Sequence, residues 1–369
     1  MEDIFRFVDD IGPAKFVHIL EPGAGLKAIV TIDNVAAGPA IGGTRMAPDV
    51  SLAECVALAR AMTFKNAAAG IPHGGAKSVI FGDPTMPPRQ RETIIRAFAT
   101  AIRDLKDYIP GPDMGTDEAA MAWIKDETAR AVGLPREVGG IPLDEIGSTG
   151  FGLTVAARVT EEFSGVKLKG ARLAVQGFGA VGRHVARFLA KEGANLVAAA
   201  DSRGAIVNPK GLDIDKLCAL KAARKSVVDL KGAKTIEGDA LIGVDCDIWI
   251  PAARPDAIRA GNVDRLKAKL VLQGANIPVT VEAEKIMHER GILAVPDFIA
   301  NAGGVIAAAV EYQGGTEKAS FDTIAEKISA NVRAVLDEAK KNRIMPRQAA
   351  VALAKARVER AMTFQRWHS

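Results

Sequence analysis

The chain has 369 residues, of which 48% are hydrophobic and 25% are charged, as expected of a folded globular protein and not of a disordered or fibrous one. The formal net charge of +4 is small for this length, and basic and acidic residues are interspersed. We therefore expect no nucleic-acid partner and no membrane surface. The length predicts two domains.

The cellular context is predicted from the cysteines and from the start of the chain. Cys55, Cys218 and Cys246 lie far apart and match no zinc spacing, which favours reduced thiols in a cytoplasmic protein. Residues Met1–Arg6 lack a basic region followed by an apolar stretch, so we expect no signal peptide. No apolar run reaches the roughly 18 residues of a membrane span, and no cluster of metal ligands appears.

The first part of the chain predicts strands followed by a helix. Residues 15–34 predict two strands around the turn Glu21–Gly25, and the Gly- and Pro-rich segment Gly38–Gly43 predicts irregular structure. Ser51 and Glu54 form a capping box that opens a helix through about Asn66.

The next elements continue this mixed pattern. Lys77–Phe81 predicts a short strand, and Arg89–Asp107 has the periodicity of an amphipathic helix. The stretch Ile109–Gly115 predicts a rigid segment before a helix capped by Thr116. A Gly- and Pro-rich segment over residues 133–152 is the predicted domain boundary.

Beyond this boundary, strands and helices alternate. The predicted strands are 171–176, 195–200, 247–250, 269–273 and 293–295. This alternation is typical of a parallel, doubly wound sheet. From about residue 319 to 365 the chain is predicted to be mostly helical and to pack back on the first domain.

Two lysines flank a glycine-rich turn in the first domain. Lys65 is predicted in the last turn of its helix, where the helix dipole favours a cation, and Lys77 opens the next strand. Two cations beside bare backbone form a receptor for a small carboxylate, and crowding makes each ammonium easier to deprotonate. One lysine can then bind a carboxylate while the other does proton chemistry.

A dinucleotide fingerprint lies in the second domain. Gln176–Gly182 carries the GxGxxG pattern between a predicted strand and a predicted helix. Asp201 ends the next strand 19 residues after Gly182, where a ribose-binding carboxylate is expected. Its charge favours NAD over NADP, although Ser202 and Arg203 follow it and leave NADP use open.

Three further positions have the setting of a chemical site. Asp113 lies between a Pro-Gly-Pro stretch and a helix start, which restrains its carboxylate. Asn276 follows a buried strand at its carboxyl end, where doubly wound sheets bind ligands. Asn301–Gly304 opens another helix with glycines that permit a close approach.

With these motifs in order, the chain resembles the Glu/Leu/Phe/Val (amino-acid) dehydrogenase family over nearly its full length. The matching segments are Gly38–Met46, Thr63–Lys77, Pro112–Thr116, Gly177–Gly182, Gly274–Asn276 and Asn301–Val305. The resemblance implies an α/β fold in which an N-terminal α/β substrate domain and a Rossmann-type, doubly wound NAD-binding domain enclose a cleft. We expect residues 1–140, completed by helices over about 330–369, to form the substrate-binding, catalytic and oligomerisation domain, and residues 141–329 the dinucleotide-binding domain.

The resemblance also implies roles for individual residues in reversible oxidative deamination of an L-amino acid to a 2-oxo acid and ammonia. Lys65 would bind the substrate α-carboxylate, Lys77 would be the catalytic lysine of low pKa, and Asp113 its partner in proton transfer. Thr149 would hold the nicotinamide carboxamide, and Asn276 would contact ribose and substrate. The expected cofactor site comprises Thr149, Gly177, Phe178, Gly179, Ala180, Val181, Gly182, Asp201, Ser202, Arg203, Ala252, Gly274, Ala275, Asn276 and Asn301.

The side-chain pocket predicts an apolar substrate. Glutamate enzymes of the family carry a lysine where this chain has Ile41 and a serine where it has Ala308. A substrate carboxylate buried there would be unpaired, at a cost of several kcal/mol. We therefore expect a substrate of the leucine, valine or phenylalanine type. The residue types do not distinguish a branched-chain substrate from an aromatic one. The expected substrate site comprises Lys65, Ile41, Gly43, Met46, Gly111, Val305 and Ala308.

Several alternatives stay open. The chain could be a glutamate dehydrogenase in which Arg45 or Arg254 binds the side-chain carboxylate, or a cofactor-binding protein without turnover. His73, where the family more often has an aliphatic residue, could tune Lys77 or be a packed or solvated imidazole. The family forms symmetric oligomers, so the resemblance implies a homo-oligomer of unspecified subunit number.

Overall fold

A computed structural model describes residues 4–365, and these divide into two compact units. The first unit contains residues 4–142, 305–320 and 351–365; the second contains 143–304 and 321–350. The first division lies close to the predicted 140/141 boundary, whereas the C-terminal helices are shared between the units. Residues 1–3 and 366–369, where the predicted N-terminal segment begins and the predicted C-terminal segment ends, lie outside the described residues.

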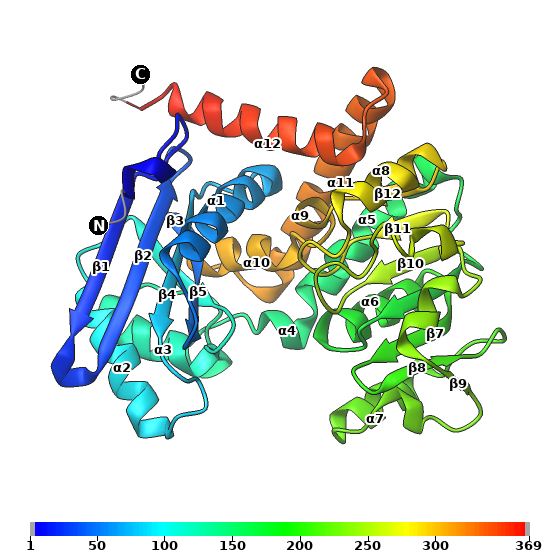
Figure 1. The fold of residues 1–369 in the computed structure, drawn as a ribbon, viewed down its shortest axis with the longest axis horizontal. Coiled ribbons are helices and arrows are strands. Elements are labelled where there is room, and N and C mark those ends of the chain that lie inside the picture. The colour runs from blue at the N-terminus through cyan, green and yellow to red at the C-terminus, as the bar shows by residue number, and fades with distance from the viewer. Residues whose placement is uncertain (1–3, 366–369) are drawn as a thin grey trace. The chain divides into compact units, whose positions relative to one another are not determined.

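The first unit is built on a five-stranded sheet (Figure 1). The strands lie in the order β1-β2-β4-β3-β5; β2 is antiparallel to β1 and β4, and β3 is parallel to β4 and β5. The strands are β1 (Lys15–Glu21), β2 (Leu26–Asn34), β3 (Ala40–Ala47), β4 (Gly75–Phe81) and β5 (Tyr108–Pro112). The helices are η1 (Ile4–Phe7), η2 (Pro22–Ala24), α1 (Leu52–Ala69), α2 (Pro88–Ala101), α3 (Glu118–Thr128) and η3 (Arg136–Val138).

The two faces of this sheet are covered by different helices. On one face, an apolar core that includes Ile80, Phe98 and Met121 joins the strands to α2 and α3. On the other face, α1 packs over β2 and β4, with Cys55 and Val79 in contact. Cys55 is fully buried. The face covered by α1 is the one that carries the candidate site.

Four sequence predictions for this unit were wrong. The segment predicted to be irregular forms β3, an inner strand, because Gly42 lets it approach β4: a Cβ there would lie 1.8 Å from the Ala76 carbonyl oxygen. Helix α2 ends at Ala101 and not at the predicted Asp107. Helix α1 continues to Ala69, so Lys65 lies before its last turn. Asp117, and not Thr116, caps α3, by accepting a hydrogen bond from the Ala120 N–H.

The second unit holds a seven-stranded sheet in the order β12-β11-β10-β6-β7-β8-β9. Its strands are β6 (Arg172–Gln176), β7 (Asn195–Asp201), β8 (Gly204–Val207), β9 (Lys234–Ile236), β10 (Ile248–Pro251), β11 (Leu270–Leu272) and β12 (Leu293–Val295). The five predicted strands are present and parallel, as in a doubly wound fold. The prediction missed β8 and β9, which extend one edge in antiparallel fashion.

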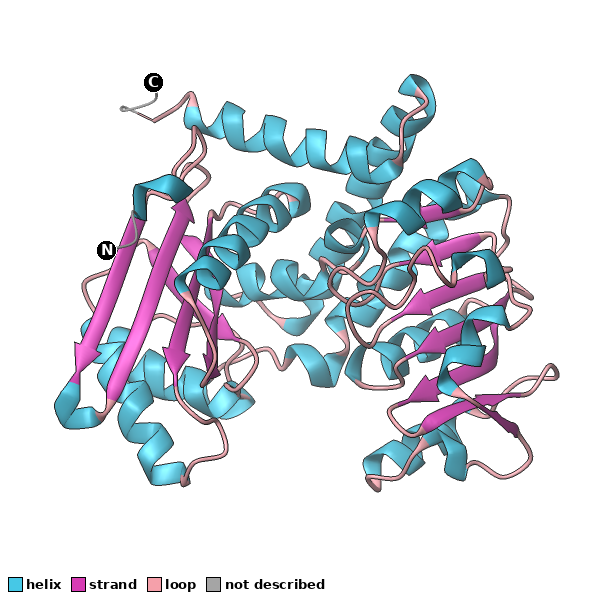
Figure 2. Cartoon of the chain, viewed as in Figure 1, coloured by secondary structure: helices cyan, strands magenta, loops and turns pink. Residues whose placement is uncertain are grey.

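Helices follow the strands of the second unit (Figure 2). They are α4 (Leu143–Ile146), α5 (Ser148–Ser164), α6 (Ala180–Lys191), α7 (Ile214–Ala222), η4 (Val227–Asp229), η5 (Gly238–Gly243), η6 (Val263–Arg265), α8 (Val281–Glu289) and α9 (Asp297–Ala300). Each of the remaining three helices crosses a division between the units: α10 (Gly303–Tyr312), α11 (Glu317–Asn342) and α12 (Pro346–Met362). No helix within residues 4–365 has the length and hydropathy to span a membrane.

Candidate active site

The alternation of side chains along three parallel strands brings polar groups to one face of the first sheet. On β3, Ala40 and Met46 belong to the core on the α2 and α3 side, so Ile41, Gly43 and Arg45 point to the opposite face, where α1 lies. By the same alternation Lys77 on β4 points there as well. Gly111 on β5 and Asp113, which follows β5, share this face.

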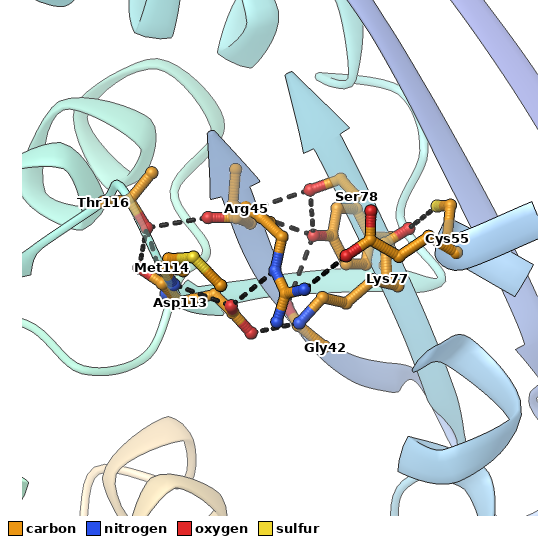
Figure 3. Close-up of polar contacts among 11 residues, drawn as sticks. Gly42, Arg45, Cys55, Lys77, Ser78, Asp113, Met114 and Thr116 are labelled. Atoms are coloured by element: carbon orange, nitrogen blue, oxygen red, sulfur yellow. Dashed lines mark hydrogen bonds and ion pairs between the residues drawn. The ribbon is translucent and has the colours of Figure 1, made fainter. Parts of the chain in front are cut away.

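Asp113 is the hub of this group (Figure 3). One carboxylate oxygen accepts hydrogen bonds from Arg45 Nε at 3.0 Å and from the Met114 N–H at 2.6 Å. The other oxygen accepts from Lys77 Nζ. Arg45 is itself held by Glu54, in the first turn of α1. Thr116, whose hydroxyl donates to the Thr44 carbonyl, accepts from the Asp113 N–H and fixes its backbone.

Lys77 is buried, with only 4% of its side chain exposed. Its pKa is lowered from the ordinary lysine value because burial disfavours the charged ammonium; Asp113 opposes this effect and Arg45 adds to it. The pKa of Asp113 is also lowered: burial by itself would raise it, but Lys77 and Arg45 stabilise the carboxylate. A buried amine with a lowered pKa can lose its proton nearer to neutral pH than an exposed lysine.

Because Gly43 has no side chain, it leaves space for the ion pair between Lys77 and Asp113. A Cβ at Gly43 would lie 2.7 Å from an Asp113 carboxylate oxygen and 3.0 Å from Lys77 Nζ. Both distances are shorter than a Cβ tolerates without movement of the neighbouring group. Gly43 is thus required by the geometry of the ion pair.

A buried polar network supports the strands from the other face. The Tyr108 hydroxyl lies 2.8 Å from Ser78 Oγ and 3.3 Å from Thr44 Oγ1, which links β5, β4 and β3. Tyr108 is fully buried, and burial raises the pKa of its phenol well above its usual range. The hydroxyls therefore remain neutral and hold the three strands in register below Lys77 and Asp113.

The charge of Arg45 predicts a pH dependence. Replacing Arg45 by Gln removes a cation that lowers the pKa of Lys77, so the protonated form should persist to higher pH. If Lys77 acts as a base, the rise of kcat/KM with pH should move to higher pH in this variant. The check is a pH–rate profile of oxidative deamination.

Two further variants control that profile. Arg45→Lys keeps the charge and should return the rise towards its original position. Arg103→Gln removes an exposed cation that binds Glu127 elsewhere in the same unit, and it should leave the profile in place. A profile that stays fixed, or moves to lower pH, in Arg45→Gln would remove Lys77 from the titration.

The other predicted substrate residues have different placements. Ile41 is buried beside Gly43 on the shared face. The assignment of the Met46 side chain to the substrate site is wrong: it is fully buried in the core on the opposite face, because it follows Arg45 by one residue in a strand. Lys65 lies half-buried on α1, and its predicted contact with a substrate carboxylate remains a prediction.

Helix α10 carries the last two predicted pocket residues, Val305 and Ala308, and its C-terminal end is anchored to the first unit. Glu311 accepts hydrogen bonds from the N–H groups of Gly133 and Leu134, each at 2.9 Å. The Tyr312 ring packs edge-on against His73, with 5.6 Å between centroids. His73 donates through Nδ1 to the Pro39 carbonyl at 2.9 Å, as a buried, packed imidazole.

In the second unit, the fingerprint forms the expected loop between β6 and α6. Gly177 has φ of +93°, and a Cβ at Gly182 would lie 2.0 Å from the Gly177 carbonyl oxygen, so the turn and the close packing of helix on strand both need glycine. A Cβ at Gly179, the residue that caps α6, would meet no described atom within 4 Å. This open space at a helix N-terminus fits a pyrophosphate.

A cavity of about 690 Å³ lies beside this loop. Its walls include fewer than half of the predicted cofactor residues, together with cations from neighbouring segments. The lining comprises Gln176, Gly177, Phe178, Gly179, Ala200, Asp201, Ser202, Arg203, Gly204, Lys221, Gly238, Asp239, Ala252, Ala253 and Arg254. A cavity of this size next to a phosphate-binding turn fits one end of a dinucleotide.

Asp201 accepts more hydrogen bonds than the sequence suggested. Its carboxylate accepts from Lys221 Nζ at 2.8 Å, from Ser226 Oγ at 2.7 Å and from the N–H groups of Arg203 and Val227. The pKa of Asp201 falls to about 2, because these donors outweigh its burial. Since Lys221 neutralises its charge, Asp201 repels a 2′-phosphate less than the sequence-based argument assumed.

The remaining predicted cofactor residues meet near the carboxyl end of β11. Asn301 donates through Nδ2 to the Ala275 carbonyl at 3.1 Å and to Asn276 Oδ1 at 3.3 Å. Its own Oδ1 is buried and accepts no hydrogen bond within the described residues. Thr149 is the second residue of α5, and a Cβ at Gly304 would lie 3.2 Å from its hydroxyl.

Sequence reasoning missed the part that Arg45 plays. It treated Arg45 only as a possible partner of a substrate carboxylate, because Gly38–Gly43 was predicted to be irregular. Had the segment been predicted as a strand, alternation would have placed Arg45 on the face of Gly43. Lys221 and Glu54 were also missed, since each reaches its partner from another element.

Comparison with known proteins identifies the family of the chain. The family model described as "Glutamate/Leucine/Phenylalanine/Valine dehydrogenase" matches residues 139–366, and the model "Glu/Leu/Phe/Val dehydrogenase, dimerisation domain" matches residues 17–130. Among curated relatives, a glutamate dehydrogenase of Aeropyrum pernix is 38% identical over 98% of this chain and 96% of its own length.

Two further relatives differ in substrate or cofactor. An NADP(+)-dependent glutamate dehydrogenase of Pyrobaculum calidifontis is 37% identical over 90% of this chain and 85% of its own. The solved L-tryptophan dehydrogenase of Nostoc punctiforme superposes with a TM-score of 0.76 at 26% identity, covering 97% of this chain and 99% of that one. The chain therefore belongs to the glutamate/leucine/phenylalanine/valine dehydrogenase family and is an amino-acid dehydrogenase of the kind that uses a nicotinamide cofactor.

Proposed function

We propose that this protein catalyses reversible, NAD-dependent oxidative deamination of an L-amino acid with a large apolar side chain, of the leucine, valine or phenylalanine type. The observation that carries the proposal is the position of Ile41, an apolar residue two positions before Gly43 on the face that holds Lys77 and Asp113. Gly111 pairs with Gly43 across β3 and β5, and a Cβ there would lie 3.2 Å from the Val132 side chain, so the lining beside Gly43 stays narrow and apolar. Val305 and Ala308 are the proposed remaining lining.

The contacts of the two arginines argue against glutamate as the substrate. Arg45 is committed to Asp113 and Glu54, and Arg254 lines the cavity beside the dinucleotide loop of the second unit. Neither cation is therefore suited to bind a side-chain carboxylate. A carboxylate placed against Ile41 would lose its hydration without gaining a partner, at a cost of several kcal/mol.

The chemistry assigned to the first unit is proton transfer. The nicotinamide, when bound, accepts the hydride from the substrate α-carbon. Lys65 is proposed to bind the α-carboxylate. Neutral Lys77 would take a proton from the water that attacks the substrate iminium carbon, and Asp113, within hydrogen-bond distance of Lys77, would relay protons as ammonia leaves. The net reaction converts amino acid, water and NAD⁺ to 2-oxo acid, ammonia, NADH and a proton.

The cofactor is proposed to be NAD, with NADP also accepted. Asp201 provides acceptors at the position expected for a ribose diol, but its charge is offset by Lys221. Arg203, which pairs with Asp229 at an exposed position, and Arg254 add positive charge to the same cavity. This combination would tolerate a 2′-phosphate.

A homo-oligomer and a cytoplasmic location complete the proposal. The match of residues 17–130 to a dimerisation domain supports assembly. The three cysteines are unpaired and buried thiols, which suits a reducing compartment. No group of three or more potential ligand side chains that could hold a metal ion occurs among residues 4–365.

The test is a panel of initial rates read by NADH or NADPH absorbance. Leucine, valine, methionine, phenylalanine, tryptophan and glutamate would each be assayed with NAD and with NADP. We expect kcat/KM for the best apolar substrate to exceed that for glutamate by at least about 100-fold, the discrimination expected from about 3 kcal/mol. Dominance of glutamate would overturn the pocket argument.

A variant sharpens this panel. Ile41→Lys places a cation on the face of Gly43 and should raise kcat/KM for glutamate while lowering it for leucine. Lys27→Ala, which removes an exposed lysine on β2, is the control and should leave the ratio unchanged. A glutamate/leucine ratio that is the same in Ile41→Lys as in the native protein would place Ile41 outside the substrate pocket.

A further inference from the structure

A second buried cluster of charges lies wholly within the second unit, outside the proton-transfer site. At its centre Arg347, in the first turn of α12, donates from Nε to Glu284 at 2.6 Å. Its Nη2 donates to Gln273 Oε1 and to Asp297 Oδ1, each at 3.0 Å. Gln273 in turn donates to Glu284 at 2.7 Å. Gln273, Glu284 and Asp297 are all buried.

The Asp297 carboxylate connects this cluster to a strained loop. Its second oxygen accepts from the Ile277 N–H at 2.8 Å. Ile277 has φ of +49°, a left-handed conformation that is unfavourable for a β-branched residue. The side chain of Ile277 is exposed, so core packing does not hold it there. Two backbone hydrogen bonds hold it there instead. Its N–H donates to Asp297, and its carbonyl accepts from the Asp256 N–H.

The strained residue directly follows the proposed cofactor-contacting segment Gly274–Asn276. The same short helix that begins at Asp297 ends at Asn301, whose side chain binds the Ala275 carbonyl and Asn276. The cluster therefore anchors the backbone next to Asn276 through Ile277. It also anchors Asn301 through the short helix that begins at Asp297. Gln273, at the carboxyl end of β11, anchors the start of the segment.

The geometry points to Arg347 as a positioning residue for the cofactor: by fixing Gln273 and Asp297, it holds Ile277 in its left-handed conformation and so fixes the loop 274–277 that carries Asn276. This role rests on the proposed function, since it assumes that Asn276 and Asn301 meet the cofactor. Arg347 itself touches neither the fingerprint loop nor the cavity beside it within the described contacts.

The experiment measures NADH affinity by fluorescence in the full-length protein without amino acid. Arg347→Ala should raise the Kd for NADH at least tenfold. Arg347→Lys keeps a cation for the two carboxylates but cannot make the three-way contact. It should show an intermediate loss, and it serves as the test variant if the alanine variant does not fold. The matched control is Arg333→Ala, which removes an exposed arginine on α11 that binds Glu162 in the same unit.

A double variant asks whether Arg347 acts through the strained loop. Glycine adopts positive φ without penalty, so Ile277→Gly should need less support from Asp297. Added to Arg347→Ala or Arg347→Lys, it should recover at least threefold of the lost NADH affinity, whereas alone it should change affinity less than threefold. A double variant no better than the single one would overturn the proposed route through Ile277.

The outcomes separate this inference from the proposed function. If the native protein binds NADH and deaminates an amino acid while both Arg347 variants keep its NADH affinity within twofold, the positioning role fails and the function stands. If the native protein does not bind NADH at all, both fail. Equal losses in Arg347→Ala and Arg333→Ala would also count against a specific role.

Discussion

Replacing Lys77 by Ala is expected to lower kcat for oxidative deamination by about 100- to 10,000-fold, the range that a positioned general acid or base contributes. The amine is buried and bonded to Asp113, in a setting that lowers its pKa. Alanine removes the only amine on Asp113 among the described contacts, although Arg45 still pairs with the carboxylate. The fold should therefore survive while proton transfer does not.

A measurement of cofactor affinity distinguishes a loss of catalysis from a general loss of structure in Lys77→Ala. The fingerprint loop and the cavity beside it belong to the second unit, so Lys77→Ala should bind NADH with nearly native affinity. Fluorescence titration and steady-state rates on the same preparation would show the two effects separately. Lys27→Ala serves again as the exposed control. An unchanged kcat would remove Lys77 from the mechanism, and a parallel loss of NADH binding would indicate a structural effect instead.

The second large effect is expected from Gly43→Ala. The added methyl would lie 2.7 Å from the Asp113 carboxylate and 3.0 Å from Lys77 Nζ, so at least one of them must move. A displacement of about 1 Å at reacting groups can cost roughly 100-fold in rate. We expect a loss of that order in kcat with a small change in melting temperature, because the groups that must move are side chains and not the backbone of a neighbouring strand.

The adjacent glycine provides the contrast. A Cβ at Gly42 would lie 1.8 Å from the Ala76 carbonyl oxygen, in the backbone of the neighbouring strand. Gly42→Ala should therefore separate β3 from β4 and lower stability by at least the 1–3 kcal/mol typical of overpacking, measured by denaturant unfolding. If the two variants lose stability equally and Gly43→Ala keeps its rate, the proposed use of Gly43 is wrong.

The charges around Asp113 are paired with one another inside the first unit. Arg45, Lys77 and Asp113 bind one another and do not need the substrate side chain for their charge balance. Under the proposed function, we therefore expect substrate choice to depend on Ile41 and Gly111 and not on this pairing. The relatives of this chain include proteins named as glutamate and tryptophan dehydrogenases.

Much of this protein was accessible from sequence because the signals are local. The doubly wound sheet follows from alternating apolar strands and helices, and the dinucleotide loop from three glycines whose spacing is set by a turn. The residues Lys77 and Asp113 could be singled out by motif. Predictions failed where a local signal opposed a tertiary one. The glycines before Thr44 argue against a strand, yet in the tertiary structure they allow β3 to pair closely with β4.

The sequence by itself determined the order of elements, the family and the residues available for chemistry, since these depend on neighbours along the chain. Only the tertiary structure decided how charges are shared: that Arg45 binds Asp113, that Lys221 neutralises Asp201, and that Arg347 joins Glu284 to Asp297. The partners in each pair are separated by 20 to 68 residues, although some lie less than 3 Å apart. Electrostatic interactions depend on distance in space and on burial, and neither can be read from residue order.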